Sequence, residues 1–314
     1  AAAGLSGATC EHYRIVLDDE ETTGLFVAAA RALAAADVPP EIAAGLRLGR
    51  MIALRKPTGI GVRGLVMSDV FRRLVSRTMA QQLGEDFDEA CAPFQYALAT
   101  RSGPECVARA LRVACELDPR ATVISIDGIG AYDHTWRRNM LAGIRRRPAL
   151  AQALPYVRLF YGQASEYVWY DDEGVPHPVH QVEGGEQGDP LMPGLFALGQ
   201  HPALEAAQAQ LQQGESLYAY LDDLYVVCKP ERARDVFDLL RACLREHARI
   251  EVNLGKTRVW NAAGEEPLRC SELGTAGTPC WVGNWALPAG KQGFLVLGAP
   301  LGSQAFVQEQ LRRK

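Results

Sequence analysis

Two adjacent carboxylates, Asp222 and Asp223, interrupt the apolar and aromatic stretch SLYAYLDDLYVV. The residues on both sides favour β-strands, so the stretch predicts two strands joined by a tight turn with the acids at its tip. Burying two like charges side by side costs several kcal/mol per ion unless a partner compensates them. The two acids are therefore either turn residues in contact with water or ligands for a metal ion.

A third carboxylate, Asp127, ends the short apolar run TVISID, which predicts a buried strand. Gly128 and Gly130 lie beside it, and glycines at such a position allow a ligand to approach the backbone closely. Asp133, six positions after Asp127, either supports it or caps the helix that begins near Thr135. Taken alone, this pattern is explained better by a strand-ending acid in a turn than by a metal ligand.

Two further segments have the composition of tight turns. The segment GGEQGDPLMP (184–193) contains three glycines and two prolines and precedes a predicted helix, so its backbone can pass close to a substrate. The segment NLGKT (253–257) places a single lysine, Lys256, on a turn after a strand. Each segment also has an ordinary interpretation, a helix-entry loop for the first and a solvated lysine for the second.

The Asp-Asp dipeptide occurs a second time, at Asp171 and Asp172 in the stretch YVWYDDEGVPHPVHQV. This stretch predicts a hairpin whose turn runs from Asp171 to Gly174. The glycine and two prolines indicate an exposed tip, so we interpret this acid pair as solvated. His177 and His180 lie on the same hairpin, and we expect them on the surface rather than on a metal.

Composition places the chain among ordinary globular proteins. At 314 residues, with 48% hydrophobic and 22% charged residues, it can form one large domain or two closely packed ones. No apolar run of about 18 residues predicts a transmembrane helix, and the N-terminus lacks the pattern of a secretory signal. Because the sequence begins without Met, we expect a piece of a longer protein. Eight cysteines without a CxxC pair disfavour a zinc site and indicate reduced thiols.

The net charge of −4 argues weakly against a nucleic-acid partner, yet arginines gather locally. Basic patches, rather than the total charge, determine binding to a phosphate backbone. We interpret each cluster first as the solvated face of a helix. The clusters are Arg72, Arg73 and Arg77, then Arg137 and Arg138, then Arg145, Arg146 and Arg147.

The predicted helices and strands follow one another without a regular βαβ repeat. These elements must position the acids and the turns described above. Helices are predicted over residues 21–37, 104–117, 193–213 and 231–249. Ser68 is the expected N-cap of another helix, whose apolar face carries Val70, Phe71, Leu74, Val75 and Met79. This order of elements indicates an antiparallel sheet backed by helices, an α+β layer fold.

The order of the motifs resembles the palm of a reverse transcriptase. Asp127 to Asp133 resembles the first palm motif of that family, Gln187 to Pro193 its QGxPLSP motif, Tyr220 to Asp223 its YxDD box, and Asn253 to Thr257 its NxxKT motif. Phe294 to Gly298 resembles the element that grips the primer, and Gln95 to Gly103 loosely resembles the stretch QxGFRxGRS. The resemblance covers about residues 50–300, and four motifs in order are far more specific than one. It is greatest for retrotransposons without long terminal repeats, followed by group II introns.

The resemblance implies an RNA-directed DNA polymerase with a right-hand palm and fingers. It implies two Mg²⁺ ions, replaceable by Mn²⁺, held by Asp127 and Asp222 with support from Asp223, and a general acid at Lys256. The implied nucleotide-binding residues are Lys56, Arg63, Tyr132, Gln187 and Gly188, of which Tyr132 would exclude a ribose 2′-hydroxyl. The implied primer and template contacts are Pro190, Tyr220, Leu297 and Gly298. The sequence departs from the motif at Met192, which replaces a serine, and at Asp189, which adds an acid.

The resemblance also implies a division into domains and a set of partners. The domains are an N-terminal helical extension (1–49), fingers (50–120), a palm (121–290) with finger elements inserted near 136–185, and a primer-grip element with the start of a truncated thumb (291–314). The expected partners are an RNA template, a DNA primer, dNTPs and further domains of a longer polyprotein, with no membrane. We expect an intracellular location, with access to the nucleus if the protein serves a retrotransposon.

Three alternatives remain open. The first is an RNA-templated RNA polymerase, which Tyr132 disfavours. The second is a catalytically inactive, nucleic-acid-binding remnant of a reverse transcriptase. The third is an α+β domain whose acids are all turn residues, and it must explain four ordered motifs by chance.

Overall fold

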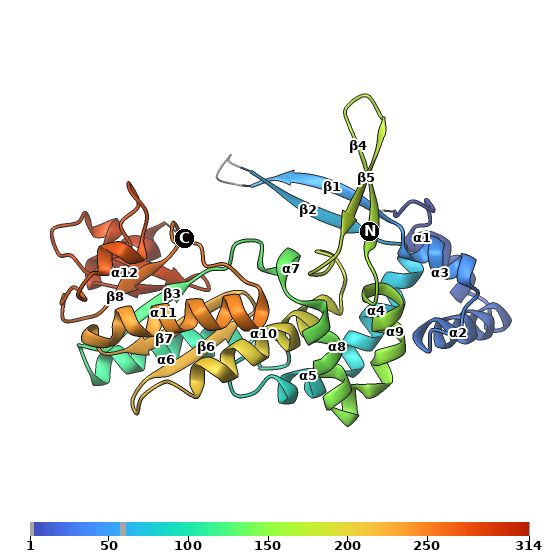
Figure 1. Ribbon diagram of the computed structural model, residues 1–314. Coiled ribbons are helices and arrows are strands. Elements are labelled where there is room, and N and C mark those ends of the chain that lie inside the picture. Colours follow the sequence, from blue (N-terminus) through green and yellow to red (C-terminus); the bar gives the residue numbers. More distant parts are fainter. Residues whose placement is uncertain (1–2, 57–60, 314) are drawn as a thin grey trace. The chain divides into compact units, whose positions relative to one another are not determined.

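The computed structural model describes residues 3–56 and 61–313 (Figure 1). The chain divides into two compact units. The first unit comprises Ala1–Ala90 and Tyr132–Gly199, and the second comprises Cys91–Ala131 and Gln200–Lys314. The chain passes between them after Ala90 and within two helices, α7 (Ala131–His134) and α10 (Met192–Gln208).

A four-stranded antiparallel sheet, ordered β6-β7-β3-β8, forms the centre of the second unit. Its strands are β3 (Thr122–Ile126), β6 (Ser216–Tyr220), β7 (Asp223–Cys228) and β8 (Arg258–Trp260). The two central strands are apolar on both faces because helices cover the sheet, as α6 (Gly103–Leu117) and α11 (Ala233–Cys243) do in Figure 1. Leu111 of α6 is fully buried against Val123 and Tyr225, and burial of such a side chain contributes about 1.5–3 kcal/mol.

The remainder of the second unit consists of a second hairpin, a C-terminal helix and several short helices. A hairpin of β9 (Gly293–Val296) and β10 (Ala299–Gly302) is followed by α12 (Gln304–Arg312). The short helices are η2 (Pro230–Arg232), the π-helical turn η3 (Leu244–Ala248), η4 (Cys270–Leu273) and η5 (Ala289–Lys291). All eight cysteines of the chain are free thiols, as the sequence predicts.

The first unit has its own four-stranded sheet, ordered β2-β1-β4-β5. The strands are β1 (Gly49–Arg55), β2 (Val62–Met67), β4 (Ser165–Tyr170) and β5 (Pro176–Gln181). The predicted hairpin of β4 and β5 is confirmed, β1 and β2 form another hairpin, and β1 pairs with β4 in parallel. The helices of this unit are α1 (Cys10–Leu17), α2 (Glu20–Ala34), α3 (Pro40–Arg47), α4 (Val70–Gln82), α5 (Gly84–Ala90), α8 (Arg137–Arg146), η1 (Pro148–Ala153) and α9 (Leu154–Tyr161).

Helix α4 differs from its prediction at the N-cap. The cap is Asp69, whose carboxylate accepts a hydrogen bond from the Phe71 N–H at 2.8 Å. Ser68, the predicted cap, is buried one residue earlier. Both residue types favour this position, and an ionised carboxylate also interacts favourably with the positive end of the helix dipole.

The interpretation of the arginine clusters as solvated helix faces is wrong for two residues. Arg72 on α4 is 1% exposed and Arg137 on α8 is 5% exposed. The Arg137 guanidinium donates hydrogen bonds to the Gly184 carbonyl at 2.7 Å and to the Ser165 hydroxyl at 2.8 Å. Periodicity could not reveal either residue, because arginine is rarely buried unless it is paired and the partners are distant in sequence.

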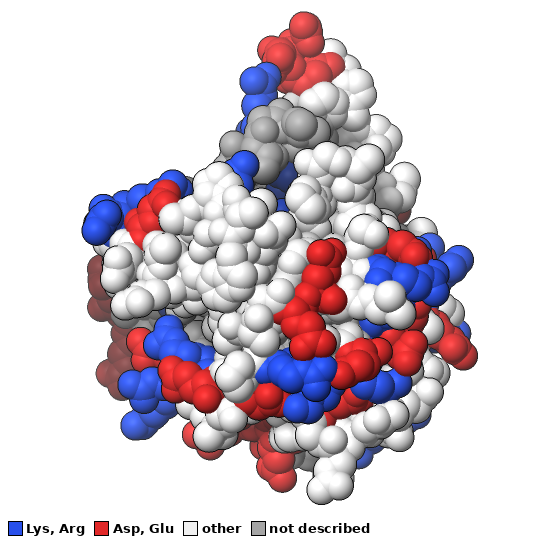
Figure 2. All heavy atoms as spheres, turned by 90° about the vertical axis from the view of Figure 1, so that its left-hand side faces the viewer, with Lys and Arg blue, Asp and Glu red and all other residues white. Residues whose placement is uncertain are grey.

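Basic and acidic side chains on the surface of the second unit pair with one another. Arg120 contacts both Glu231 and Glu265, and Arg234 lies 3.0 Å from Glu272. Figure 2 shows the two kinds of side chain interleaved on this face. Exposed pairs of this kind contribute about 0–1 kcal/mol each, so they balance charge more than they stabilise the fold.

The observed architecture confirms the predicted α+β fold with an antiparallel sheet backed by helices. Within the residues that the structure describes, no helix is long and apolar enough to cross a membrane.

Candidate active site

Three predicted carboxylates lie at one edge of the β6-β7-β3-β8 sheet. Asp127 directly follows β3, and Asp223 is the first residue of β7. The register pairs Ile126 with Leu224, so the next residue of each strand brings Asp127 and Asp223 alongside each other. Asp222 precedes Asp223 in the turn. The strand ends therefore gather acids that lie about a hundred positions apart in the sequence.

The hairpin tip is smaller than the sequence predicts. Tyr220 pairs with Asp223, so only Leu221 and Asp222 form the turn between β6 and β7. The prediction that both acids occupy the tip is therefore wrong for Asp223, which belongs to the strand. A two-residue connection suits an antiparallel hairpin, and it leaves Asp223 fixed by the strand pairing while Asp222 lies in the turn.

Leu221 adopts a left-handed backbone conformation with a φ of 54°. This conformation is unfavourable for a residue with a branched side chain, so the surroundings must stabilise it. The buried side chain of Gln95 accepts a hydrogen bond from the Leu221 N–H at 2.6 Å. The backbone of residues 94–96 also pairs with Ala219 of β6. Gln95 is thus a site-supporting residue that the sequence signalled only through the loose QxGFRxGRS resemblance.

Replacement of Gln95 by leucine is expected to lower the free energy of unfolding by about 1–3 kcal/mol. The substitution removes the acceptor of the Leu221 N–H and leaves a strained turn without its support. Denaturant unfolding measures the loss. Gln208→Leu, at the exposed end of α10, is the matched control and should stay within about 0.5 kcal/mol of the wild type. Equal stabilities of the two variants would refute the role of Gln95.

Lys256 contacts the first carboxylate directly. Its Nζ lies 2.9 Å from Asp127 Oδ2, and the lysine side chain is 64% exposed. Asn253 holds the same turn against the strand end, because its N–H donates to the Asp127 carbonyl at 2.8 Å and its side-chain amide lies 3.4 Å from Asp127 Oδ2. Thr257 is fully buried and donates its hydroxyl hydrogen to the Asn253 carbonyl at 3.2 Å. The NLGKT segment therefore places an ammonium group on the acidic edge.

The surroundings of Asp223 disfavour its charged form. Burial, together with the carboxylates of Asp222 and Asp127, raises the pKa of Asp223 to about 6. In the described part of the chain, no three His, Cys, Asp or Glu side chains are gathered closely enough to enclose a metal ion by themselves. The acids thus form an open edge, with the Lys256 ammonium group beside Asp127, rather than a closed cage.

The predicted primer contacts in the second unit also have defined positions. Leu297 and Gly298 form the two-residue turn between β9 and β10, with φ values of 49° and 89°. Two positive φ values in succession are typical of a type I′ hairpin turn. Leu297 packs against the core cluster that contains Tyr225 of β7. Tyr220 packs beside Gly103, the first residue of α6.

In the first unit, Gln187 and Gly188 occupy the centre of a tight turn. The Asp189 N–H donates to the Glu186 carbonyl at 3.1 Å and closes the turn around them. Gly188 has a φ of 129°, and a Cβ at this position would lie 2.6 Å from the Val66 carbonyl oxygen. Glycine is therefore required here for both the backbone conformation and the close approach to β2. Pro190 follows the turn and is half-buried.

Tyr132 is held by an aromatic stack within the same unit. Its ring lies parallel to that of Phe196 on α10, with centroids 4.5 Å apart. The neighbouring Asp133 accepts a hydrogen bond from the Gln187 side-chain amide at 3.2 Å. Asp133 therefore supports the Gln187 turn, whereas the sequence offered Asp127 or a helix cap as its partner.

Lys56 and Arg63 lie on the exposed β1–β2 hairpin of the first unit. The Lys56 N–H donates to the Gly61 carbonyl at 3.1 Å, and Arg63 pairs with Leu54 across the hairpin. The predicted site residues thus divide between the units. Asp127, Asp222, Asp223, Lys256, Tyr220, Leu297 and Gly298 belong to the second unit, and Lys56, Arg63, Tyr132, Gln187, Gly188 and Pro190 belong to the first.

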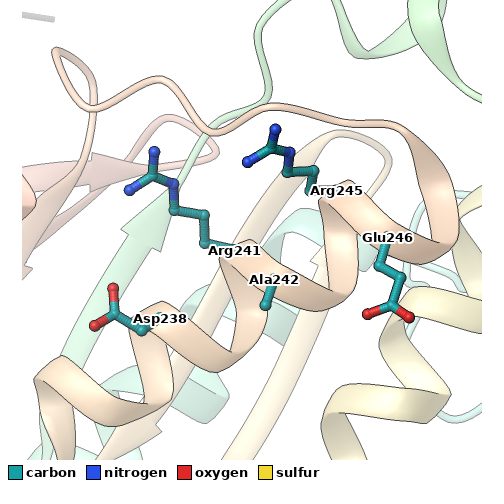
Figure 3. Close-up of a pocket in the computed structure, with 5 residues that line it drawn as sticks. All are labelled: Asp238, Arg241, Ala242, Arg245 and Glu246. Carbon is teal, nitrogen blue, oxygen red and sulfur yellow. The ribbon is translucent and has the colours of Figure 1, made fainter.

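A separate surface hollow of about 500 Å³ lies along α11 and the π-helical turn that follows it (Figure 3). Asp238, Arg241, Ala242, Arg245 and Glu246 line it. None of the predicted site residues lines it. Its charges are balanced, so it offers no preference for an anion or a cation.

Comparison with known proteins identifies relatives of the chain. The family described as "Reverse transcriptase (RNA-dependent DNA polymerase)" matches residues 54–301. The chain is 25% identical over 266 residues to the "Retrotransposable element SLACS 132 kDa protein" of Trypanosoma brucei gambiense. That alignment covers 84% of this chain but 22% of the relative, so the chain spans about a fifth of that protein's length.

A solved structure shares the fold at low sequence identity. It is the telomerase of Candida albicans, determined in complex with a fragment of telomeric RNA. The TM-score is 0.53 at 12% identity, and the match covers 86% of this chain and 46% of the telomerase chain. The resemblance to retrotransposon reverse transcriptases and the palm-like fold are both confirmed. Because the family match spans most of the sequence, with the acidic sheet edge inside it, the chain belongs to the reverse transcriptase family of nucleotidyltransferases.

Proposed function

We propose that this chain extends the 3′-hydroxyl of a DNA primer with dNTPs on an RNA template, as part of a retrotransposon protein. The observation that carries the proposal is the edge of the palm sheet, where Asp127, Asp222 and Asp223 meet the ammonium group of Lys256. Family membership supports the reaction class. The retrotransposable element from which the trypanosome relative comes supports the biological setting.

The chemistry of the acidic edge fits divalent cations. Carboxylate oxygens suit Mg²⁺, which usually binds one or two protein carboxylates and takes its other ligands from water and substrate phosphates. An open edge with raised Asp223 pKa matches this preference, since a bound cation would relieve the repulsion among the acids. Asp127, Asp222 and Asp223 would hold the ions. When bound, two Mg²⁺ ions would activate the attacking hydroxyl and neutralise charge on the leaving pyrophosphate, and Mn²⁺ could replace them.

The residues around the carboxylates have separate proposed tasks. Lys256 Nζ would donate a proton to an oxygen of the leaving pyrophosphate, as its exposure and its position beside Asp127 allow. Arg63 and Lys56 would bind the β- and γ-phosphates, and the Arg63 guanidinium can do so through two parallel hydrogen bonds. The Gln187–Gly188 turn would contact the nucleotide and template through its backbone. Pro190, Tyr220 and the Leu297–Gly298 turn would position the template and primer.

Primer extension tests the proposal. The full chain, with whatever native sequence flanks it, should extend a DNA primer on an RNA template with dNTPs in the presence of Mg²⁺. EDTA should stop extension, and excess Mg²⁺ should restore it, because the acids alone repel one another. RNA binding that weakens with salt but supports no extension would identify a catalytically inactive remnant and refute the proposed activity.

A further inference from the structure

A buried ion cluster lies behind the Gln187–Gly188 turn of the first unit. Its members are Arg72 of α4 and the two acids that flank the turn, Glu186 and Asp189. The side chains of the three residues are at most 2% exposed. Arg72 and Glu186 are more than a hundred positions apart in the sequence. The cluster therefore joins a helix to both ends of a surface turn.

The contacts of Arg72 favour Glu186 over Asp189. Arg72 Nη1 donates a hydrogen bond to Glu186 Oε1 at 3.1 Å, and Nη2 lies 3.0 Å from Oε2 in an ion-pair contact. The distance from Nη2 to Asp189 Oδ2 is 3.7 Å. Phe160 covers the guanidinium face, with its ring centroid 3.9 Å from Arg72 Cζ. The planar guanidinium group of Arg72 is thus hydrogen-bonded to Glu186 and lies near the carboxylate of Asp189.

The Asp189 carboxylate accepts hydrogen bonds from other residues. Tyr161 donates its hydroxyl hydrogen to Asp189 Oδ2 at 2.5 Å, and the Leu191 N–H donates to Oδ1 at 3.0 Å. The Ser76 hydroxyl of α4 also binds Oδ1. Burial raises the pKa of Glu186, an effect that Arg72 opposes. Removal of Arg72 alone would therefore leave Glu186 in an apolar environment without its cation, whereas Asp189 would keep three hydrogen bonds.

The turn between these two anchors presents its backbone outward. Gly188 is exposed although both neighbouring acids are buried, and within residues 3–56 and 61–313 its N–H has no hydrogen-bond partner. The Val66 N–H of β2 donates to the Gln187 carbonyl at 3.0 Å, which fixes the orientation of the peptide that precedes Gly188. The Gly188 N–H is thus a fixed donor on the surface of the unit.

We propose that Arg72 is a positioning residue that holds the Glu186 end of the Glu186–Asp189 turn, while Ser76 and Tyr161 hold Asp189, so that the Gly188 N–H is presented to the incoming nucleotide. This inference rests on the proposed polymerase function. A buried ion pair is often replaceable by apolar residues without loss of stability, so stability alone does not explain the cluster. Apolar side chains, however, would not hold the Glu186 end of the turn with a directional hydrogen bond. The expected consequence of losing Arg72 is weaker nucleotide binding rather than loss of the chemical step.

The test compares Arg72→Met combined with Glu186→Gln against the wild type in the full chain with its native flanking sequence. The double variant removes the charges of Arg72 and Glu186 together, and Asp189 keeps its hydrogen bonds from Ser76, Tyr161 and Leu191, so the variant is expected to fold with a nearly unchanged thermal midpoint. The KM for dNTP should rise about tenfold, with kcat within about twofold of the wild type. Hydrogen exchange of the backbone amides of residues 184–189 should accelerate by a similar factor. The single variant Arg72→Lys should show a smaller rise in KM than the double variant, because lysine keeps the positive charge but lacks the planar guanidinium group with its paired N–H donors.

Arg77→Met is the matched control, because Arg77 lies on the same helix and is exposed. It should change neither the KM for dNTP nor the amide exchange of residues 184–189. A folded double variant with wild-type KM, or with wild-type exchange in the turn, would overturn the inference. If the proposed polymerase function is wrong, the wild type itself will not extend a primer. The comparison of amide hydrogen exchange between the wild type and the double variant would still decide whether Arg72 holds the turn.

Discussion

Asp222→Asn is expected to reduce primer extension by about 10³-fold or more. Asparagine has nearly the same shape as aspartate but lacks the negative charge that would hold a divalent cation at the edge of the palm sheet. The fold should be retained, because Asp222 lies in the two-residue turn and its neighbour Asp223 remains paired with Tyr220. Removal of one carboxylate also relieves the repulsion that contributes to the raised pKa of Asp223.

Steady-state primer extension with dNTPs on an RNA template measures the loss. Asp172→Asn is the matched control, because the dipeptide Asp171-Asp172 lies in the exposed turn between β4 and β5. That variant should extend primers at the wild-type rate. Substantial activity in Asp222→Asn, together with a normal unfolding profile, would contradict the assignment of the acidic edge as the catalytic centre.

Tyr132→Ala is expected to reduce the discrimination between dNTPs and NTPs by about 10²-fold, because rejection of a single added hydroxyl depends on steric exclusion. The Tyr132 ring is fixed by its parallel stack on Phe196, with a 4° angle between the planes. A rigid ring can exclude a ribose 2′-hydroxyl, whereas alanine leaves space for it. Incorporation of NTPs should rise while incorporation of dNTPs changes little.

The ratio of kcat/KM for a dNTP to that for the matching NTP is the measurement. Tyr132→Phe should retain the discrimination, since the ring and not its hydroxyl provides the barrier. Tyr170→Ala, at the exposed end of β4, is a surface control. A Tyr132→Ala variant with unchanged discrimination would remove the steric argument for DNA synthesis and reopen the alternative of RNA synthesis.

The acidic edge could be predicted because its signals are local. Asp127 ends an apolar strand, and the two acids at 222–223 interrupt another, so each lies where a strand must stop. The pairing of β3 with β7 then brings the strand ends together. The order of the motifs supplied the specificity that a single motif lacks, since the same Asp-Asp dipeptide also occurs in an exposed turn at Asp171 and Asp172.

The supports of the site could not be predicted in the same way. Arg72 is one of three arginines on a helix whose pattern resembles a solvated face, and its partner Glu186 is more than a hundred residues away. Gln95 binds the Leu221 N–H across a similar separation of 126 positions. Helical periodicity indicates only which residues of one helix share a face. It therefore cannot predict that a charged residue is buried, because the burial depends on an ion pair with a carboxylate far away in the sequence.

The sequence by itself determined the fold class, the family and the acids at the strand ends, because these depend on local patterns and on motif order. Only the tertiary structure decided that Asp223 belongs to the strand while Asp222 occupies the turn, that Lys256 contacts Asp127, and that Arg72 is buried between two acids. The physical reason is common to all three findings. Charge pairing and backbone strain arise between segments that meet only in the folded chain, and their free energies depend on distances that no sequence spacing fixes.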